Sequence, residues 1–324
     1  MIGLKQLFIF SLLCILSSFG TTAFAKSEIN FALLVVNGEQ RNAYFELVRK
    51  FERHYPSIKV NIQAVEQESY KQYFELWLHS DARSDVMFWF GGGRLSEFAR
   101  QGLLEPIDDV WERYQWDKNI TISARSAAVV KGKTYGLPIH YYNWGIYFNK
   151  TLFDKYDLTE PQTWEEFLQI CEILKSKGIT PIALGSKDDW PVAGWFDYLN
   201  LRLNGLYFHQ QLMRGEVSYL DERVRNVFLH LGKLVNKKYF LELHAEKTWK
   251  TSLPYLYRDM AGMLLMGNFW TSQIPGPLKE KFSLFRFPKL VDDMPYFEEA
   301  PTDLLVIPTN AKNKNDAAIF LNFM

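Results

Sequence analysis

The chain has 324 residues, of which 48% are hydrophobic and 23% are charged, a balance that is typical of a globular protein and excludes a disordered or fibrous one. At roughly 150 residues per domain, this length predicts about two domains, each large enough to bury a core. Lys plus Arg and Asp plus Glu number 37 each, so the totals lack the basic excess with which nucleic-acid-binding proteins neutralise phosphates.

Aromatic residues make up an unusually large share of the chain, 16%, with 10 Trp, 17 Tyr and 25 Phe. This is more than a hydrophobic core needs. Flat rings are well suited to packing against the flat apolar faces of ligands. The composition therefore favours a ligand-binding protein.

The first 25 residues have the pattern of a cleavable signal peptide. Lys5 is followed by an apolar run from Leu7 to Leu16, and Ala23-Phe24-Ala25 forms a small-x-small cleavage site, so we expect cleavage after Ala25. The run is too short to span a bilayer. Cys14 lies inside this run, where lipid attachment is not expected. An exported chain with Cys171 as its one remaining thiol has no internal disulfide, and we expect a soluble periplasmic protein.

Strand and helix patterns alternate along the next stretch. The sequence predicts buried strands at residues 31–36, 58–64 and 86–90, separated by amphipathic helices that carry Tyr44 to Phe51 and Tyr70 to Trp77. This β-α-β-α-β order implies a parallel sheet covered by helices. Ligands of such sheets bind beyond the carboxyl ends of the strands, where residues 89–93 (WFGGG) lie.

The pattern continues further along the chain. Thr163 and Glu166 form a capping box that predicts the start of a helix, which Gly178 ends, and the spacing of Val224 to Val235 predicts another helix. No internal repeat and no Gly-, Ser- or Pro-rich linker divides the sequence. If there are two lobes, short segments must join them.

Motifs that indicate catalysis are missing. No Gly-x-Ser-x-Gly, phosphate-binding loop, His-Glu-x-x-His or Cys-x-x-Cys occurs, and the six His have no metal-ligand spacing, so we expect no enzyme activity, no metal and no cofactor. Acidic doublets occur at residues 108–109, 188–189, 292–293 and 298–299. Adjacent residues do not place two carboxylates across a sugar bond, so we interpret the doublets as solvated loops or helix starts. The Gly91 to Gly93 run is interpreted as a turn.

One segment is more specific than these patterns. It contains residues 131–139 (KGKTYGLPI), 144–150 (WGIYFNK), 161–167 (PQTWEEF) and 177–182 (KGITPI) in this order. This order resembles that of the extracellular solute-binding proteins of ABC importers, in the group that includes maltodextrin-binding proteins. Residues 85–104, 261–270 and 304–321 are similar to further segments of the same family, so the resemblance covers most of the chain after residue 25.

The resemblance implies a two-lobe α/β fold of the periplasmic-binding-protein type (type II-like), with a mostly parallel sheet flanked by helices in each lobe and a ligand cleft between the lobes. It places residues 26–142 and about 295–324 in the first lobe and residues 143–294 in the second. The crossings are expected near Tyr142 to Gly145 and within Pro288 to Pro301. The implied role is capture of a mono- or oligosaccharide by a monomer and its delivery to a membrane permease, without catalysis.

The resemblance also implies candidate substrate-binding residues. Trp89 and Trp270 match positions whose rings pack against the sugar, and Arg94 matches a hydrogen-bonding arginine. Tyr142 stands where maltodextrin binders carry an acid, which argues against maltose-like specificity. Asp189 and Trp190 fall where the second lobe of relatives offers an acid and an aromatic ring. Asp303 lies where relatives often have Gly-Gly, and we expect it to add an acceptor for a ligand hydroxyl.

Relatives in this family continue beyond the position that corresponds to Met324, so we expect the C-terminal part of the second lobe to be missing from this chain. Two other roles stay open at this point. The same fold could bind a non-sugar solute or act as the periplasmic sensory partner of a membrane kinase. A secreted glycan-active enzyme is disfavoured because no acid pair can be placed. The sugar, its affinity and the permease are not specified by these patterns.

Overall fold

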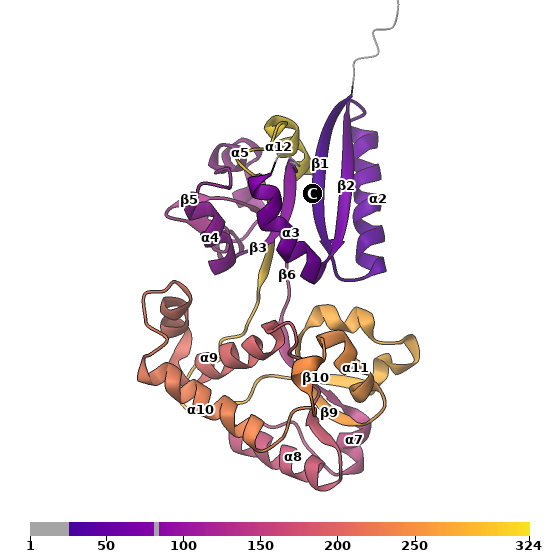
Figure 1. Ribbon diagram of the computed structural model, residues 1–324, viewed down its shortest axis with the longest axis vertical. Helices are drawn as coiled ribbons and strands as arrows, with labels where there is room; N and C mark the ends of the chain where they lie inside the picture. The colour runs from indigo at the N-terminus through magenta and orange to yellow at the C-terminus, as the bar shows by residue number, and fades with distance from the viewer. Residues whose placement is uncertain (1–25, 81–83) are drawn as a thin grey trace, which may run out of the picture.

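The computed structural model describes residues 26–80 and 84–324, and the predicted signal peptide, residues 1–25, lies outside the described residues. The molecule has two halves, each built on one sheet with helices on its faces (Figure 1). We call the half built on the sheet β2-β1-β3-β11-β6 the first lobe, and the half built on the sheet β10-β7-β9-β8 the second lobe. The predicted two-lobe α/β architecture is therefore confirmed.

The first lobe contains the N-terminal part of the described chain and its C-terminal end. Its strands are β1 (Ser27–Val35), β2 (Ile58–Glu66), β3 (Val86–Phe90), β6 (Leu137–Tyr141) and β11 (Thr302–Val306), with a small hairpin of β4 (Val129–Val130) and β5 (Lys133–Thr134). Its helices are α2 (Gly38–His54), α3 (Gln67–His79), α4 (Gly93–Arg100), α5 (Asp108–Tyr114), the short η1 (Trp116–Lys118), α6 (Ile122–Ser126) and α12 (Lys314–Phe323).

The second lobe contains the middle of the chain. Its strands are β7 (Trp144–Asn149), β8 (Thr180–Ile182), β9 (Ala261–Gly267) and β10 (Phe282–Phe285). Its α-helices are α7 (Lys150–Lys155), α8 (Trp164–Ser176), α9 (Trp190–Met213), α10 (Glu222–Asn236) and α11 (Trp249–Tyr257), and its short 3-10 helices are η2 (His244–Glu246), η3 (Asn268–Gln273) and η4 (Gly276–Lys281). The capping box predicted for α8 is present, with both of its hydrogen bonds.

In each sheet all strands but one point in the same direction, and the reversed strand makes two antiparallel pairs, so the sheets are less parallel than predicted. In the first lobe β1 pairs in parallel with β2 and β3, whereas β11 is antiparallel to both β3 and β6. In the second lobe β8 and β9 are parallel, and β7 is antiparallel to both β9 and β10. The reversed strands are β7 and β11, the first strands that the chain forms after each passage between the lobes. The strand ends that face the other lobe are therefore the carboxyl ends of the remaining strands.

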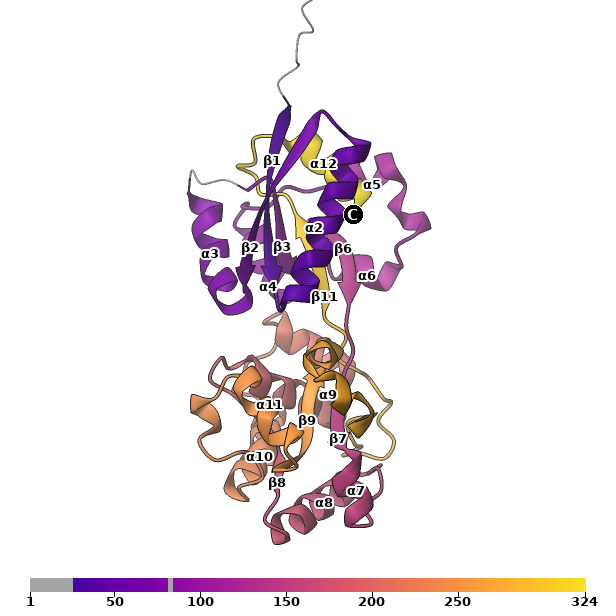
Figure 2. The same cartoon turned by 90° about the vertical axis from the view of Figure 1, so that its right-hand side faces the viewer.

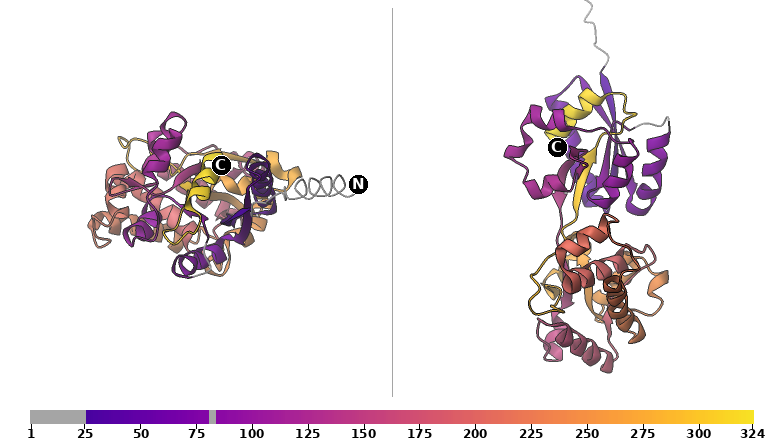
Figure 3. Two further views of the ribbon diagram at one scale, coloured as in Figure 1. Left: turned by 90° about the horizontal axis from the view of Figure 1, so that it is seen from above. Right: turned by 90° about the vertical axis from the view of Figure 1, so that its left-hand side faces the viewer.

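Two short segments connect the lobes and lie side by side (Figures 1 and 2). The Tyr142 backbone N–H donates to the Pro301 carbonyl at 3.2 Å, and the Trp144 N–H donates to the Glu299 carbonyl at 3.1 Å. Figure 3 shows the yellow returning strand entering the first lobe from the second. Few backbone dihedrals in such segments need to change for the lobes to move relative to each other.

Each lobe has a hydrophobic core of its own. In the first lobe the C-terminal helix is part of that core, because the ring of Phe320 packs against Phe31 and Phe51 with centroids 5.2 and 5.0 Å apart. The buried core of the second lobe gathers side chains of α8, α9, α10 and the strands, including the free thiol of Cys171. No helix in the described part of the chain combines the length and the apolar composition needed to cross a membrane.

Candidate functional site

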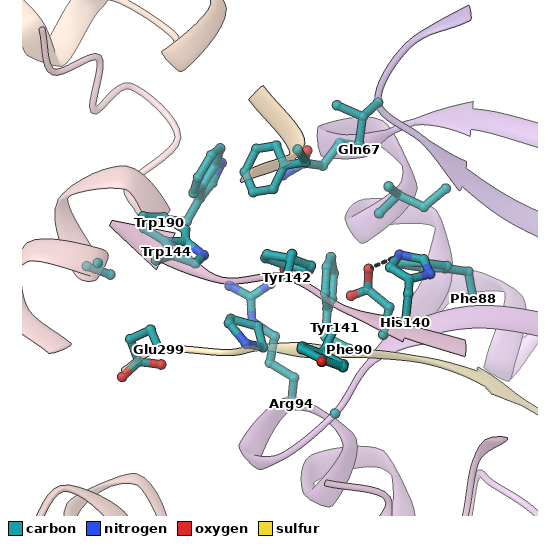
Figure 4. Close-up of a pocket in the computed structure, with 18 of the residues that line it drawn as sticks. Gln67, Phe88, Phe90, Arg94, His140, Tyr141, Tyr142, Trp144, Trp190 and Glu299 are labelled. Carbon is teal, nitrogen blue, oxygen red and sulfur yellow. Dashed lines mark ion pairs between the residues drawn. The ribbon is translucent and has the colours of Figure 1, made fainter. Parts of the chain in front are cut away.

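A cavity of about 460 Å3 lies between the lobes, where the carboxyl ends of β1, β3 and β9 face each other. Its volume falls in the lower part of the range of about 300 to 1,000 Å3 that is usual for small-molecule sites. Side chains of both lobes and of both connecting segments line it (Figure 4). A molecule held in this cavity would contact both lobes and both connecting segments.

Four aromatic side chains form what we call the aromatic wall: Tyr142, Trp144, Trp190 and Phe269. The Phe269 ring packs edge-on against Tyr142, with centroids 5.2 Å apart, and Trp190 packs edge-on against Trp144 at 5.9 Å. Because the rings pack against one another, each is held in a fixed orientation. The first lobe adds Phe88 and Phe90 on the opposite side of the cavity.

Two glycines allow the aromatic wall to form. A Cβ at Gly194 in α9 would lie 2.6 Å from the Trp144 ring, and a Cβ at Gly267 would lie 2.4 Å from the Phe269 ring. Both distances are shorter than side chains tolerate. The absence of a side chain at these positions is therefore what lets the two rings lie at the base of the cavity.

The polar side of the cavity contains a His–Asp pair. His140 Nε2 lies 2.7 Å from Oδ2 of Asp303, and the other carboxylate oxygen, Oδ1, has no hydrogen-bond partner among the described residues. Burial raises the pKa of Asp303, while the hydrogen bond from His140 opposes this increase. A buried polar atom without a partner is costly, so Oδ1 is suited to accept a hydrogen bond from a ligand hydroxyl.

A second group of charges lies toward the second lobe. Burial raises the pKa of Asp197 to about 7, although the nearby guanidinium of Arg94 lowers it. Burial raises the pKa of Glu299 to about 8, and repulsion from Asp197 and Glu298 adds to the increase. These carboxyl groups gain a proton close to neutral pH. They can then both donate and accept hydrogen bonds, which suits hydroxyl groups.

Side chains of the second lobe contact Glu299. His209 Nε2 lies 3.5 Å from Glu299 Oε1, and Asn200 Nδ2 lies 3.1 Å from His209 Nδ1. Burial lowers the pKa of His209 to about 4, so this ring is neutral at physiological pH. The adjacent Glu298 instead pairs with the buried guanidinium of Arg202 at 3.0 Å.

Glu299 makes folding stability depend on pH. Its pKa in the folded protein lies above its ordinary value of 4.5, so the folded state binds the proton more tightly and stability is lost as the pH rises from about 4.5 through 8. We expect Glu299→Gln to abolish most of this loss and to raise the free energy of unfolding above pH 8 by about 2 kcal/mol, after allowance for partial solvent screening. Urea unfolding of both proteins at a pH below 4.5 and at one above 8 measures the difference.

The control for this prediction is the adjacent isosteric change Glu298→Gln. It removes the negative charge that pairs with the buried guanidinium of Arg202, which also donates to the carbonyls of Phe287 and Phe297, and is expected to lower stability rather than to raise it. A Glu299→Gln protein that is no more stable than the wild type above pH 8 would contradict the assignment of a raised pKa to Glu299.

The structure brings four of the seven predicted site residues to the cavity: Arg94, Tyr142, Trp190 and Asp303. Two others, Trp89 and Asp189, line a neighbouring hollow of about 540 Å3, which we call the outer hollow. Trp89 is mostly buried there, with its ring stacked on Phe74 at 3.6 Å and its Nε1–H donating to the Arg94 carbonyl.

Trp270 does not reach the cavity. It is 0% exposed and packs in the core of the second lobe against Tyr147, Tyr257 and Phe282. The prediction rested on its place just after a strand end. The chain continues there as the 3-10 helix η3, which turns the preceding residue, Phe269, toward the cavity and Trp270 away from it.

Several cavity residues escaped the sequence analysis. Glu299 belongs to an acidic doublet that we interpreted as a solvated loop or a helix start. The doublet does lie in a loop and Glu298 is exposed, but the Glu299 side chain is half-buried and lines the cavity. Asp197 could have been found from the sequence, since it is the single charged residue in the apolar first half of α9. Phe269 and Trp144 carried none, because ordinary core aromatics have the same sequence pattern.

Polar contacts join the two lobes beside the cavity. Trp190 Nε1–H donates to Glu68 Oε1 at 3.1 Å, and Lys250 Nζ donates to the Val36 carbonyl at 3.1 Å. Asn37 Nδ2 also donates to Ser272 Oγ at 2.8 Å. The lobes are therefore in contact around the cavity. Within the described residues, no group of three or more His, Cys, Asp or Glu side chains is arranged to bind a metal ion.

Comparison with known families places residues 37–324 within a family model described as bacterial extracellular solute-binding protein. An uncharacterized ABC transporter extracellular-binding protein of Pyrococcus horikoshii is 27% identical over 300 residues, which cover 89% of this chain and 65% of that protein. A probable sugar-binding periplasmic protein of Rhizobium meliloti is 27% identical over 206 residues, covering 61% of this chain and 48% of that protein. The chain thus spans about half to two thirds of the length of these relatives.

Solved structures have the same fold. The bacterial solute receptor AcbH, described as having an exclusive substrate preference for β-D-galactopyranose, superposes with a TM-score of 0.82 at 28% identity, covering 92% of this chain and 76% of that chain. A chitin oligosaccharide binding protein superposes with a TM-score of 0.81 at 24% identity, covering 92% and 77%, and at that identity the likeness concerns the fold alone.

Proposed function

Because this chain belongs to the bacterial extracellular solute-binding protein family, we propose that it captures a carbohydrate outside the cytoplasmic membrane and delivers it to the permease of an ABC importer. The observation that carries this proposal is the composition of the cavity between the lobes. An aromatic wall faces hydrogen-bonding carboxyl groups across a space of small-molecule size. A sugar ring has apolar C–H faces and a rim of hydroxyls, so it matches both surfaces.

We assign roles to the residues of the cavity on this basis. Phe269 and Trp190 would pack on the sugar face, and Asp303 Oδ1, which lacks a partner in the described structure, would accept from a hydroxyl. Arg94 would donate to sugar oxygens from the first lobe. Tyr142 and Glu299 lie on the two connecting segments, so a sugar that contacts them would favour the closed arrangement of the lobes.

Further parts of the proposal follow from the family role. The lobes would be the units that close, with residues 26–142 and about 295–324 in one and residues 143–294 in the other. The predicted signal peptide would direct export to the periplasm. The protein would act as a monomeric binding protein rather than as an enzyme, in line with the relatives, which are described as binding or sugar-binding proteins.

The test is a calorimetric titration of the protein with galactose, xylose, N-acetylglucosamine and the oligosaccharides of each, alongside amino acids and polyamines. We expect saturable binding of one carbohydrate class, with affinity in the micromolar range, about −8 kcal/mol. Tryptophan fluorescence should change with the same midpoint, because Trp144 and Trp190 line the cavity. Binding of an amino acid or polyamine in place of any sugar would contradict the proposed ligand class.

A further inference from the structure

The cavity between the lobes shares part of its lining with the outer hollow. Four residues line both: Lys71, Arg94, Trp190 and Ala193. They come from α3 and α4 of the first lobe and from the first turns of α9 in the second. The outer hollow, about 540 Å3, is at least as large as the cavity itself. The two spaces therefore meet at these four residues.

A bridge between the lobes lies at the junction of the two spaces. Trp190 Nε1–H donates to Glu68 Oε1, and Lys71 Nζ lies 3.0 Å from both oxygens of the same carboxylate. The Lys71 ammonium is also 5.9 Å from the centre of the Trp190 ring. This group holds the Trp190 side chain in place, so that the indole borders both spaces.

The outer hollow has the chemistry of a sugar site. Trp190 and Phe98 supply rings, while Asp188, Asp189 and Glu97 supply carboxylates. Asp189 occupies the N-cap position of α9, yet its side chain makes no capping hydrogen bond, and its backbone has a left-handed φ of 59°. Its carboxylate is thus not used by the helix that it precedes.

A third hollow, on the other side of the cavity, is less suitable. It measures about 240 Å3 and is bordered by Asn37 and Ser272, which are hydrogen-bonded to each other across the lobes. Glu39 is the one charged residue that lines it in the described structure. Its size and its lining both favour the outer hollow as the direction in which a ligand extends.

We propose that the outer hollow is a second sugar subsite, so that the ligand is an oligosaccharide whose chain passes Arg94 and places one unit in each space. This inference rests on the proposed function, because it takes the cavity to hold a sugar. It adds to that function a minimum ligand length of two sugar units. It also assigns Glu97, Asp188 and Asp189 to the recognition of the second unit.

The experiment compares each monosaccharide with its dimer by calorimetry: galactose with galactobiose, xylose with xylobiose, and N-acetylglucosamine with chitobiose. For the sugar that binds, we expect the dimer to bind at least about ten-fold more tightly than the monomer. Glu97→Trp fills the outer hollow from the exposed face of α4 and should bring the ratio of the two affinities close to one. Asp188→Ala removes an acceptor from the same hollow and should lower the ratio in the same direction.

Thr271→Trp provides the matched control, because it adds the same bulk to the third hollow and should leave the ratio unchanged. Circular dichroism verifies the fold of each variant. The proposal is overturned if monomer and dimer bind equally, if Glu97→Trp and Asp188→Ala leave the ratio intact, or if Thr271→Trp abolishes it. Failure of every sugar to bind would contradict the proposed function itself, an outcome distinct from equal binding of monomer and dimer.

Discussion

Replacing Trp270 by alanine is expected to lower the free energy of unfolding by about 3 to 5 kcal/mol while leaving carbohydrate affinity nearly unchanged. Its indole is 0% exposed and lies among the rings of Tyr147, Tyr257 and Phe282. Removal of the indole leaves a cavity that the surrounding rings cannot fill without distortion. Urea unfolding followed by far-ultraviolet circular dichroism measures the loss, and calorimetry of the folded protein measures the affinity.

Trp270→Phe is the control for this prediction, because it keeps a ring in the same place and should cost less stability. The result that would contradict the structural role is specific. A Trp270→Ala protein that unfolds at the same urea concentration as the wild type, but binds sugar much more weakly, would place this residue in the cleft after all.

The second large effect is expected at Trp190. We expect Trp190→Ala to weaken carbohydrate binding by about 2 kcal/mol, or roughly thirty-fold, as for an aromatic anchor of a binding site. The ring forms part of the aromatic wall, and its Nε1–H bridges to Glu68 of the opposite lobe. The change therefore removes both a surface on which we propose that the sugar packs and a contact between the lobes. The affinity is measured by calorimetry rather than by tryptophan fluorescence, because the mutation also removes one of the fluorescent side chains.

Two further variants separate these two contributions. Trp190→Phe keeps a ring but lacks the indole N–H, so it should retain most of the packing and lose only the bridge. Glu68→Gln keeps an acceptor for the bridge and should weaken binding little. If the Trp190→Ala protein binds the sugar as tightly as the wild type, then Trp190 lines the cavity without contributing to binding.

Much of the fold could be predicted from local patterns. The alternation of apolar runs and amphipathic helices indicated the parallel core of the first lobe, and the Thr163–Glu166 capping box marked the start of α8. These features depend on neighbouring residues, which is why a single sequence reveals them. Strand direction was harder, because the reversal of β7 and β11 results from the two passages between the lobes.

The site was only partly predictable. The motif order pointed to the correct strand ends, and Arg94, Tyr142, Trp190 and Asp303 do line the cavity. The same reasoning chose Trp270 over its neighbour Phe269 and dismissed the doublet that contains Glu299. In both cases the choice depended on the direction of one side chain in an irregular segment, which no periodicity specifies.

The sequence by itself determined the class of this protein: an α/β chain rich in aromatic residues whose motif order is that of a solute-binding family. It did so because burial patterns, caps and motifs are local properties. Only the tertiary structure decided which rings line the cavity and which carboxylates share it. Asp197 and Glu299 are about a hundred positions apart in the sequence and come together only when the returning segment crosses α9. Their mutual repulsion and burial, and hence the raised pKa of Glu299, exist only in the folded molecule.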